Sequence, residues 1–248
     1  ELAVGNALGS NLANTGLVLA VTALIVSVPV SRGIFRRELA VMVAVTLCAG
    51  LVLHNGYLGR WECVALVALV PVFLYIISRG GVAPDIIEDQ NCNLSLPKAW
   101  LILIVGLVGL IGFSDLLVRS AIETASRAGV SELIIGATVV AVGTSLPELA
   151  ASLTSALKGK TDIALGNVLG SNIFNLLLVL PIAGIIHPTA IDPAAFTRDF
   201  GLLMIMSILL TLVCFVGIWR QKDKFSIGRL TGLMLLFIYI LYYYVLFA

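Results

Sequence analysis

The chain consists of long apolar runs separated by short polar segments. About 20 consecutive apolar residues in a helix are needed to cross the roughly 30 Å hydrocarbon layer of a bilayer. The one long polar interruption runs from Arg79 to Lys98 and contains two adjacent glycines, Pro84 and three acids, which is typical of a connecting loop. Eight membrane-spanning helices are therefore predicted, with approximate limits 3–29, 38–56, 61–78, 99–120, 132–157, 163–187, 200–219 and 228–248.

The composition agrees with this membrane class. Hydrophobic residues make up 60% of the 248 residues and charged residues 12%, and the mean hydropathy is +1.09. Soluble domains carry about 25% charged residues, so a soluble fold is excluded. The net charge of +1 provides no basic excess for a nucleic-acid partner, and the four cysteines show no metal-binding or redox spacing. We expect an all-α integral membrane protein without a cofactor, whose surroundings are the lipid bilayer.

The basic residues predict how the bundle is oriented in the membrane. Lys and Arg in short loops are retained on the cytoplasmic side. Of the 15 basic residues, 11 fall on the side of the long loop and four on the opposite side. We therefore expect a multi-pass protein of the cell (inner or plasma) membrane, with the loop 81–98 cytoplasmic and both chain ends, including the C-terminus, extracytoplasmic.

An internal repeat is the most informative feature of the sequence. Residues 1–20 align with residues 162–181 at a constant offset of 161, with 11 identities, and both copies contain Gly-Asn-x-Leu-Gly-Ser-Asn. The copies begin the first and sixth predicted spans, and an odd separation of five spans means that they enter the membrane from opposite faces. Such inverted repeats are the architecture of secondary transporters, which place their site between the repeats and expose it alternately to each side.

The repeat also predicts the domain organisation. Residues 1–80 hold three spans that are equivalent to the last three of the five spans in residues 99–248, and the loop 81–98 connects the two repeats. If the halves are equivalent, two further spans are expected before Glu1. The fold class is then an inverted-repeat transporter bundle, with eight of ten expected transmembrane helices in this chain.

An acidic residue lies at membrane depth in the segment Gly143-Thr-Ser-Leu-Pro-Glu148. A carboxylate there costs several kcal/mol unless it is paired, protonated or solvated, so it indicates function. Pro147 removes the hydrogen bond to the Gly143 carbonyl, which predicts a helix break beside the acid. Ser145 lies three residues before Glu148, so the hydroxyl and the carboxylate share one helical face.

Each repeat copy adds a hydroxyl and an amide to this chemistry. The spacing of four places Ser10 with Asn14, and Ser171 with Asn175, on one face of a helix. Together with a carboxylate and freed backbone carbonyls, these are the oxygen ligands of a hard cation. One carboxylate suffices for Na⁺ or a proton, whereas a divalent ion would be better served by a second acid. Four other amides lie off this face and are expected to pack helices: Asn6, Asn11, Asn167 and Asn172.

These two motifs together resemble the cation/calcium antiporter superfamily, and the chain is similar to prokaryotic sodium/calcium exchangers. The resemblance covers the whole chain and implies two inverted five-helix halves that exchange Na⁺ for Ca²⁺. It implies that Glu148 is the central carboxylate for both ions. Asp115, in the preceding span, lies at an acidic position typical of the family, but we expect it to pair with a nearby helix end and not to bind the ion. The other implied metal ligands are Ser145, the carbonyl of Thr144, Ser171 and Asn175, with Ser10 and Asn14 as their first-repeat counterparts. The acidic motif of the first repeat is absent from this chain.

Two alternatives remain at this stage. One is a proton-coupled Ca²⁺ or cation exchanger of the same fold. It differs only in its coupling ion, and the sequence discriminates poorly between Na⁺ and H⁺ in that role. An intramembrane protease is a remote alternative, because His54 and His187 lie at span ends and neither is placed to activate Ser145. We therefore expect a transporter, not an enzyme, with Ca²⁺, Na⁺ or H⁺ as bound partners and no obligatory protein partner. The first and sixth spans are expected to slide or tilt and expose Glu148 alternately.

Overall fold

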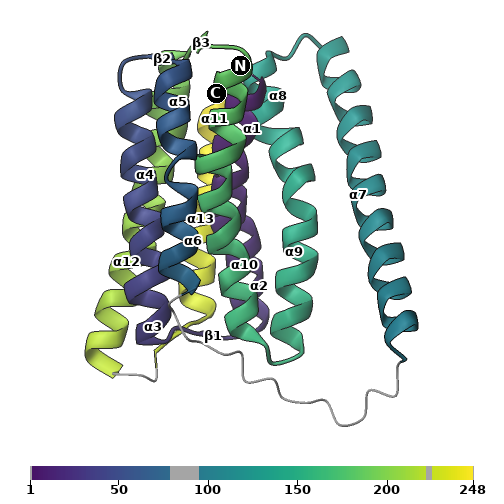
Figure 1. The fold of residues 1–248 in the computed structure, drawn as a ribbon, viewed down its shortest axis with the longest axis vertical. Helices are drawn as coiled ribbons and strands as arrows, with labels where there is room; N and C mark the ends of the chain where they lie inside the picture. The colour runs from purple at the N-terminus through teal and green to yellow at the C-terminus, as the bar shows by residue number, and fades with distance from the viewer. Residues whose placement is uncertain (1, 79–94, 222–224, 248) are drawn as a thin grey trace.

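The computed structural model describes residues 2–78, 95–221 and 225–247, and these form a bundle of helices aligned along one axis (Figure 1). The first half begins with one long helical segment that contains a π-helical stretch and continues through two more helical segments. Its elements are α1 (Leu2–Ala13), η1 (Asn14–Leu19), α2 (Ala20–Ile25), β1 (Val28–Pro29), α3 (Arg32–Ile34), η2 (Phe35–Leu39), α4 (Ala40–Leu53), β2 (Tyr57–Leu58), α5 (Arg60–Val67) and α6 (Val70–Ser78).

The second half has the same character, with π-helical stretches inside three of its long helical segments. Its elements are α7 (Leu96–Arg127), α8 (Glu132–Ile135), η3 (Gly136–Val140), α9 (Ala141–Leu157), α10 (Thr161–Phe174), η4 (Asn175–Val179), α11 (Leu180–Ile186), β3 (Thr189–Ala190), η5 (Ala195–Phe200), α12 (Gly201–Gln221), β4 (Ser226–Ile227) and α13 (Arg229–Phe247).

Seven helical segments of the described residues are long and apolar enough to cross a membrane, which confirms the all-α membrane class. They correspond to seven of the eight predicted spans. The remaining one, predicted at 38–56, is the segment Arg32–Leu53, which begins earlier and carries Arg36, Arg37 and Glu38 in its first two turns. These charges lower its hydropathy, so the count of eight stays a prediction.

The predicted boundaries around the long loop need correction. Most of the loop, residues 79–94, lies outside the described residues. Its predicted last residues, 96–98, are already helical, because α7 begins at Leu96 with Pro97 in its first turn, where the missing N–H of proline has no helical partner to lose. The same helix continues to Arg127, beyond the predicted end at 120.

Two short antiparallel pairings join the halves at opposite ends of the bundle. β1 pairs with β4, and β2 pairs with β3 at the end where α1 begins and α13 ends (Figure 1). Each pairing therefore joins a loop of the first half to a loop of the second. β3 follows β1 by 161 residues, the offset of the sequence repeat, and β4 follows β2 by 169.

Glycines bring α1 unusually close to the start of the α8–η3–α9 segment. A Cβ atom at Gly5 would lie 2.6 Å from the Leu133 carbonyl oxygen, and a Cβ at Gly136 would lie 2.5 Å from the Leu2 carbonyl oxygen. Small residues allow helix backbones to approach in this way. The close approach places the polar residues of α1 directly against those of α9.

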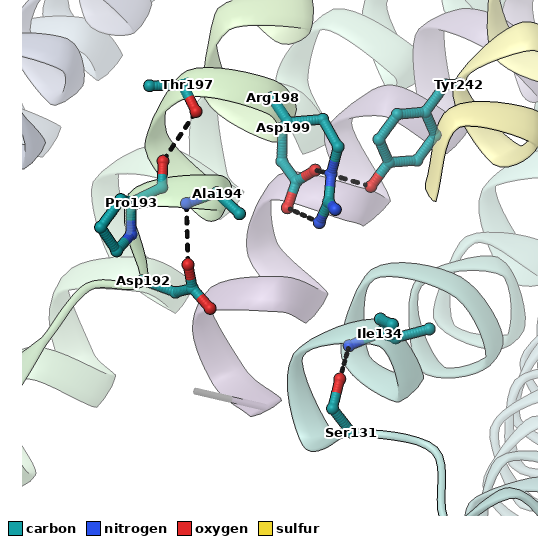
Figure 2. Close-up of polar contacts among 9 residues, drawn as sticks. All are labelled: Ser131, Ile134, Asp192, Pro193, Ala194, Thr197, Arg198, Asp199 and Tyr242. Carbon is teal, nitrogen blue, oxygen red and sulfur yellow. Dashed lines mark hydrogen bonds and ion pairs between the residues drawn. The ribbon is translucent and has the colours of Figure 1, made fainter. Parts of the chain in front are cut away.

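An ion pair within η5 is linked to α13 by a tyrosine near the end of the bundle where the chain termini lie. The Asp199 side chain is fully buried and receives two hydrogen bonds from Arg198, at 2.6 and 3.2 Å, and one from the Tyr242 hydroxyl at 3.2 Å (Figure 2). Just before it, the Asp192 carboxylate accepts a 2.7 Å hydrogen bond from the Ala194 N–H, which caps the start of the helix. These contacts fix the start of α12 against α13.

Candidate cation-binding site

The acidic motif lies on α9, which packs between α1 and α10. The expected helix break at this motif is wrong, because α9 runs through Pro147 to Leu157. The Gly143 carbonyl, which Pro147 leaves without a helical donor, instead accepts a 2.5 Å hydrogen bond from the Ser114 hydroxyl of α7. The distortion of this segment lies earlier, in the π-helical stretch η3, and π-helical turns are frequent at functional sites.

The Glu148 carboxylate is held on one oxygen only. The Ser171 hydroxyl donates to Glu148 Oε1 over 3.5 Å, whereas Oε2 is buried and has no hydrogen-bond partner in the part of the chain that the structure describes. Asn167 Nδ2 donates to the Glu148 main-chain oxygen at 3.3 Å and to the Ser152 hydroxyl at 2.9 Å. The backbone at Glu148 is therefore fixed to α10, while one carboxylate oxygen stays available.

Ser10 and Thr144 form a second polar contact, between α1 and α9. Their hydroxyl oxygens lie 3.1 Å apart, and both hydroxyls also lie within hydrogen-bond distance of Asn6 Oδ1, at 3.3 and 3.1 Å respectively. The Thr144 hydroxyl further approaches the main-chain oxygens one turn earlier in its own helix. The hydroxyl of Thr144 thus ties the two helices together, and the role of its carbonyl as a ligand stays a prediction.

Two predicted ligands are buried without any hydrogen bond from their side chains. Asn14 is 1% exposed and Ser145 2% exposed. Among the described residues, no hydrogen-bond partner contacts the amide oxygen or nitrogen of Asn14 or the hydroxyl of Ser145. An unpaired polar group costs free energy when it is buried, so each such group calls for an explanation. Oxygen atoms kept free for a cation provide one.

The Asn175 amide lies on η4 and donates from Nδ2 to Asn11 Oδ1 at 3.0 Å. The π-helical stretches η1 and η4 begin at Asn14 and Asn175, the equivalent amides of the two repeat copies. The helix therefore changes its winding at the predicted ligand in both copies. Nothing in the apolar pattern of the sequence indicates these π-helical turns.

The structure brings together two pairs of predicted ligands, Glu148 with Ser171 and Ser10 with Thr144. Within the described residues it forms no hydrogen bond among the side chains of Ser145, Asn14 and Asn175. The sequence predicted only a packing role for four amides that hydrogen-bond in this region, Asn6, Asn11, Asn167 and Asn172. It also did not single out Ser114 or Ser152. A serine within an apolar span was the available signal, but many such serines only join helices.

An opening lies beside the site, between α7 and α9. It has a volume of about 250 Å³ and is lined by Ser114, Asp115, Thr144 and Pro147 together with two apolar residues. Asp115 forms an ion pair of 2.7 Å with Arg119 on its own helix, so it pairs one turn away and not with another helix end. The opening therefore reaches the candidate site at Thr144, whereas Ser145 and Glu148 do not line it.

The family model described as sodium/calcium exchanger protein matches residues 1–79 and 98–248. The chain belongs to the sodium/calcium exchanger family. It is 40% identical to the putative antiporter CaxA of Alkalimonas amylolytica over 100% of this chain and 79% of that protein. It is 37% identical to the inner membrane protein YrbG of Escherichia coli over 95% of this chain and 74% of that protein. With the sodium/calcium exchanger MaX1 of Methanosarcina acetivorans it shares 43% identity over 46% of this chain and 32% of that protein.

A solved structure of the sodium-calcium exchanger NCX_Mj, soaked with Na⁺ and Sr²⁺, has the same fold. The TM-score is 0.76 with 30% identity, over 97% of this chain and 75% of that protein. The predicted resemblance and the transporter fold are thus confirmed, and the chain is a multi-pass membrane protein. Its relatives in the sodium/calcium exchanger family are exchangers and not enzymes, so the class of activity is cation exchange.

Proposed function

We propose that the protein exchanges Na⁺ for Ca²⁺ across the cell membrane by alternating access, and that Glu148 binds the two ions in competition. The observation that carries this proposal is the free Glu148 Oε2 at membrane depth. A buried carboxylate oxygen without a hydrogen-bond donor is favourable only if a cation or a proton balances its charge.

The ligand set of the proposed site is made of oxygen atoms. Glu148 and Ser145 come from α9, Ser171 and Asn175 from the repeat copy on α10 and η4, and Ser10 and Asn14 from the other copy. Carboxylate, hydroxyl and amide oxygens suit hard ions such as Ca²⁺ and Na⁺. The Thr144 main-chain oxygen completes the set.

The proposed inverted repeat is supported by the two pairings at the ends of the bundle. A two-fold axis in the membrane plane exchanges the two repeats and the two membrane faces. It would convert the β1–β4 pairing at one end into the β3–β2 pairing at the other, which is the arrangement observed. Of the 11 basic residues predicted on one side, the eight that the structure describes belong to segments at the β1–β4 end, which we propose to be cytoplasmic.

Alternating access in this proposal exposes Glu148 to one face at a time. The segments that carry the repeat motif, Leu2–Ile25 and Thr161–Ile186, tilt or slide against α9. A cysteine at position 171 would test this motion. Reaction with membrane-impermeant reagents from only one face in each ion condition supports it, and equal reaction from both faces at once contradicts it, since that describes a channel.

The transport experiment uses vesicles that contain the protein, loaded to impose a Na⁺ gradient or a pH gradient. We expect Ca²⁺ uptake driven by Na⁺ and abolished in Glu148→Gln. The matched control is Glu123→Gln, which changes an exposed acid paired with Arg127 on α7 and leaves uptake intact. Uptake driven only by the pH gradient would replace Na⁺ by H⁺ as the coupling ion, and no Ca²⁺ flux under either gradient would refute the substrate assignment.

A further inference from the structure

Four buried or half-buried amides of the two repeat copies lie at equivalent positions, and three of them, Asn11, Asn172 and Asn175, are joined by hydrogen bonds. Asn11 and Asn172 occupy equivalent positions at the offset of 161, as do Asn14 and Asn175. Asn11 and Asn172 are 0% and 2% exposed, and Asn11 Nδ2 donates a 3.2 Å hydrogen bond to the Asn172 main-chain oxygen. The two helices are thus joined at their equivalent asparagines.

The same Asn11 side chain orients a predicted ligand. Its Oδ1 accepts the 3.0 Å hydrogen bond from Asn175 Nδ2. The oxygen and the nitrogen of an amide branch from one carbon, so a nitrogen held on Asn11 directs the Asn175 oxygen away from Asn11. Asn11 can accept this hydrogen bond only when its side-chain amide is turned with Oδ1 toward Asn175. The hydrogen bond that Asn11 Nδ2 donates to the Asn172 main-chain oxygen fixes the amide in that orientation.

The equivalent hydrogen bond of the other copy, between Asn14 and Asn172, is not formed in the described structure. Asn172 Nδ2 donates to the Thr15 hydroxyl at 3.0 Å, a bond that the first copy cannot mirror because Leu176 stands at the equivalent position. Asn172 Oδ1 and both amide atoms of Asn14 are buried, and the described part of the chain offers none of them a partner. A bond from Asn14 Nδ2 to Asn172 Oδ1 would mirror the Asn175–Asn11 bond and satisfy two of these three atoms.

We propose that Asn11 and Asn172 are positioning residues that turn the amide oxygens of Asn175 and Asn14 toward the transported cation. In this structure the Asn11–Asn175 hydrogen bond is formed and the Asn172–Asn14 hydrogen bond is not. The second bond closes when a cation binds the Asn14 oxygen, because the amide then has its nitrogen directed to Asn172. This inference rests on the proposed function and adds residues that do not touch the ion.

The test is a double-mutant cycle on Ca²⁺ affinity, measured by calorimetry on the detergent-solubilised protein. We expect Asn11→Leu to weaken Ca²⁺ binding on the order of tenfold, since the Asn175 amide loses its orienting partner. We expect no additional loss when Asn11→Leu is placed in the Asn175→Ala background, because there is no amide left to orient. Losses that multiply in the double variant would contradict the inference and indicate a general structural effect.

The matched control is Thr22→Val, which removes another buried hydrogen bond of the same helical segment, from the Thr22 hydroxyl to the Val18 main-chain oxygen at 2.7 Å. It should lower the melting temperature without changing Ca²⁺ affinity. Asn11→Ser, which is too short to reach Asn175, gives the same affinity loss and serves if Asn11→Leu does not fold.

The hydrogen bond that is not formed here, between Asn172 and Asn14, is tested by Asn172→Leu with Asn14→Ala. We expect the same lack of additivity, because Asn172 acts only through the Asn14 amide. Wild-type Ca²⁺ affinity in the folded Asn11 and Asn172 variants would overturn this inference alone. A wild-type protein that neither binds nor transports Ca²⁺ would overturn the proposed function and the inference together.

Discussion

The Ser10 and Thr144 hydroxyls lie 3.1 Å apart although 134 residues separate them in the sequence. The contact depends on the close approach of α1 to the helical segment that carries Thr144. Gly9, the residue before Ser10, has no side chain, and its backbone lies against Ala137 and Ala141. The glycines of the repeat motif thus act on the candidate site through the distance between two helices.

We therefore expect Gly9→Ala to destabilise the protein and to weaken Ca²⁺ binding. The added Cβ would lie 2.5 Å from the Ala137 carbonyl oxygen and 2.8 Å from the Ala141 Cβ, so the helices must move apart, at a cost of about 1–3 kcal/mol. Thermal unfolding and calorimetric Ca²⁺ titration measure both effects. Gly112→Ala is the control, because a Cβ there meets nothing within 4 Å; equal melting temperatures for the two variants would contradict the packing argument.

Removing the Ser145 hydroxyl should separate stability from binding. Because Ser145 Oγ is buried without a partner, we expect Ser145→Ala to unfold at the same or a higher temperature than wild type and to bind Ca²⁺ more weakly. Ser152→Ala is the comparison, since Ser152 Oγ donates to the Ala164 main-chain oxygen at 3.3 Å and accepts from Asn167. That variant should lose about 1 kcal/mol or more of unfolding free energy. A Ser145→Ala protein that is less stable yet binds Ca²⁺ normally would remove Ser145 from the ligand set.

The buried ion pair of Arg198 and Asp199 should matter far more for stability than the exposed pair of Asp115 and Arg119. The Asp199 side chain is 0% exposed and the Arg198 side chain 25% exposed, so removing the carboxylate charge leaves a partly buried guanidinium without its counter-charge, at a cost of about 1–3 kcal/mol. We expect Asp199→Asn to lower the melting temperature strongly. Asp115→Asn removes a surface pair of neighbouring helical turns, worth about 0.3–0.5 kcal/mol. Similar unfolding temperatures of the two variants would show that the contacts of Asp199 with Arg198 and Tyr242 do not stabilise the packing of η5 against α13.

Cation binding itself should stabilise the folded protein. A ligand at 100 times its dissociation constant adds about 2.7 kcal/mol to the unfolding free energy. We expect Ca²⁺ to raise the melting temperature of the wild type, a chelator to reverse the rise, and Glu148→Gln to abolish it. A Ca²⁺-dependent rise of equal size in Glu148→Gln would place the bound ion elsewhere.

The sequence predicted the membrane class, seven of the helical segments and the family, because apolar length and repeated motifs are local properties of a chain. It mispredicted the break at Gly143, because the Ser114 hydroxyl that satisfies this carbonyl comes from another helix. It also treated Asn11 as a packing residue. Helical spacing shows only which residues share a face of one helix. The hydrogen-bond partners of Asn11 are Asn172 and Asn175, which lie 161 or more residues away in the sequence.

The pairings β1–β4 and β2–β3 restrict the motions that are open to this bundle. Each is extended by one more backbone hydrogen bond, from the Val30 N–H to the Phe225 oxygen at 3.0 Å and from the Ile191 N–H to the Gly56 oxygen at 2.9 Å. Separation of the two halves at either membrane face would have to break one of these β pairings and leave its backbone groups without hydrogen bonds. The loops at the two ends of the α8–η3–α9 segment belong to neither pairing. The helices joined by these pairings are thus constrained relative to one another at both ends, whereas the repeat segments Leu2–Ile25 and Thr161–Ile186 can shift against α9 without opening either pairing.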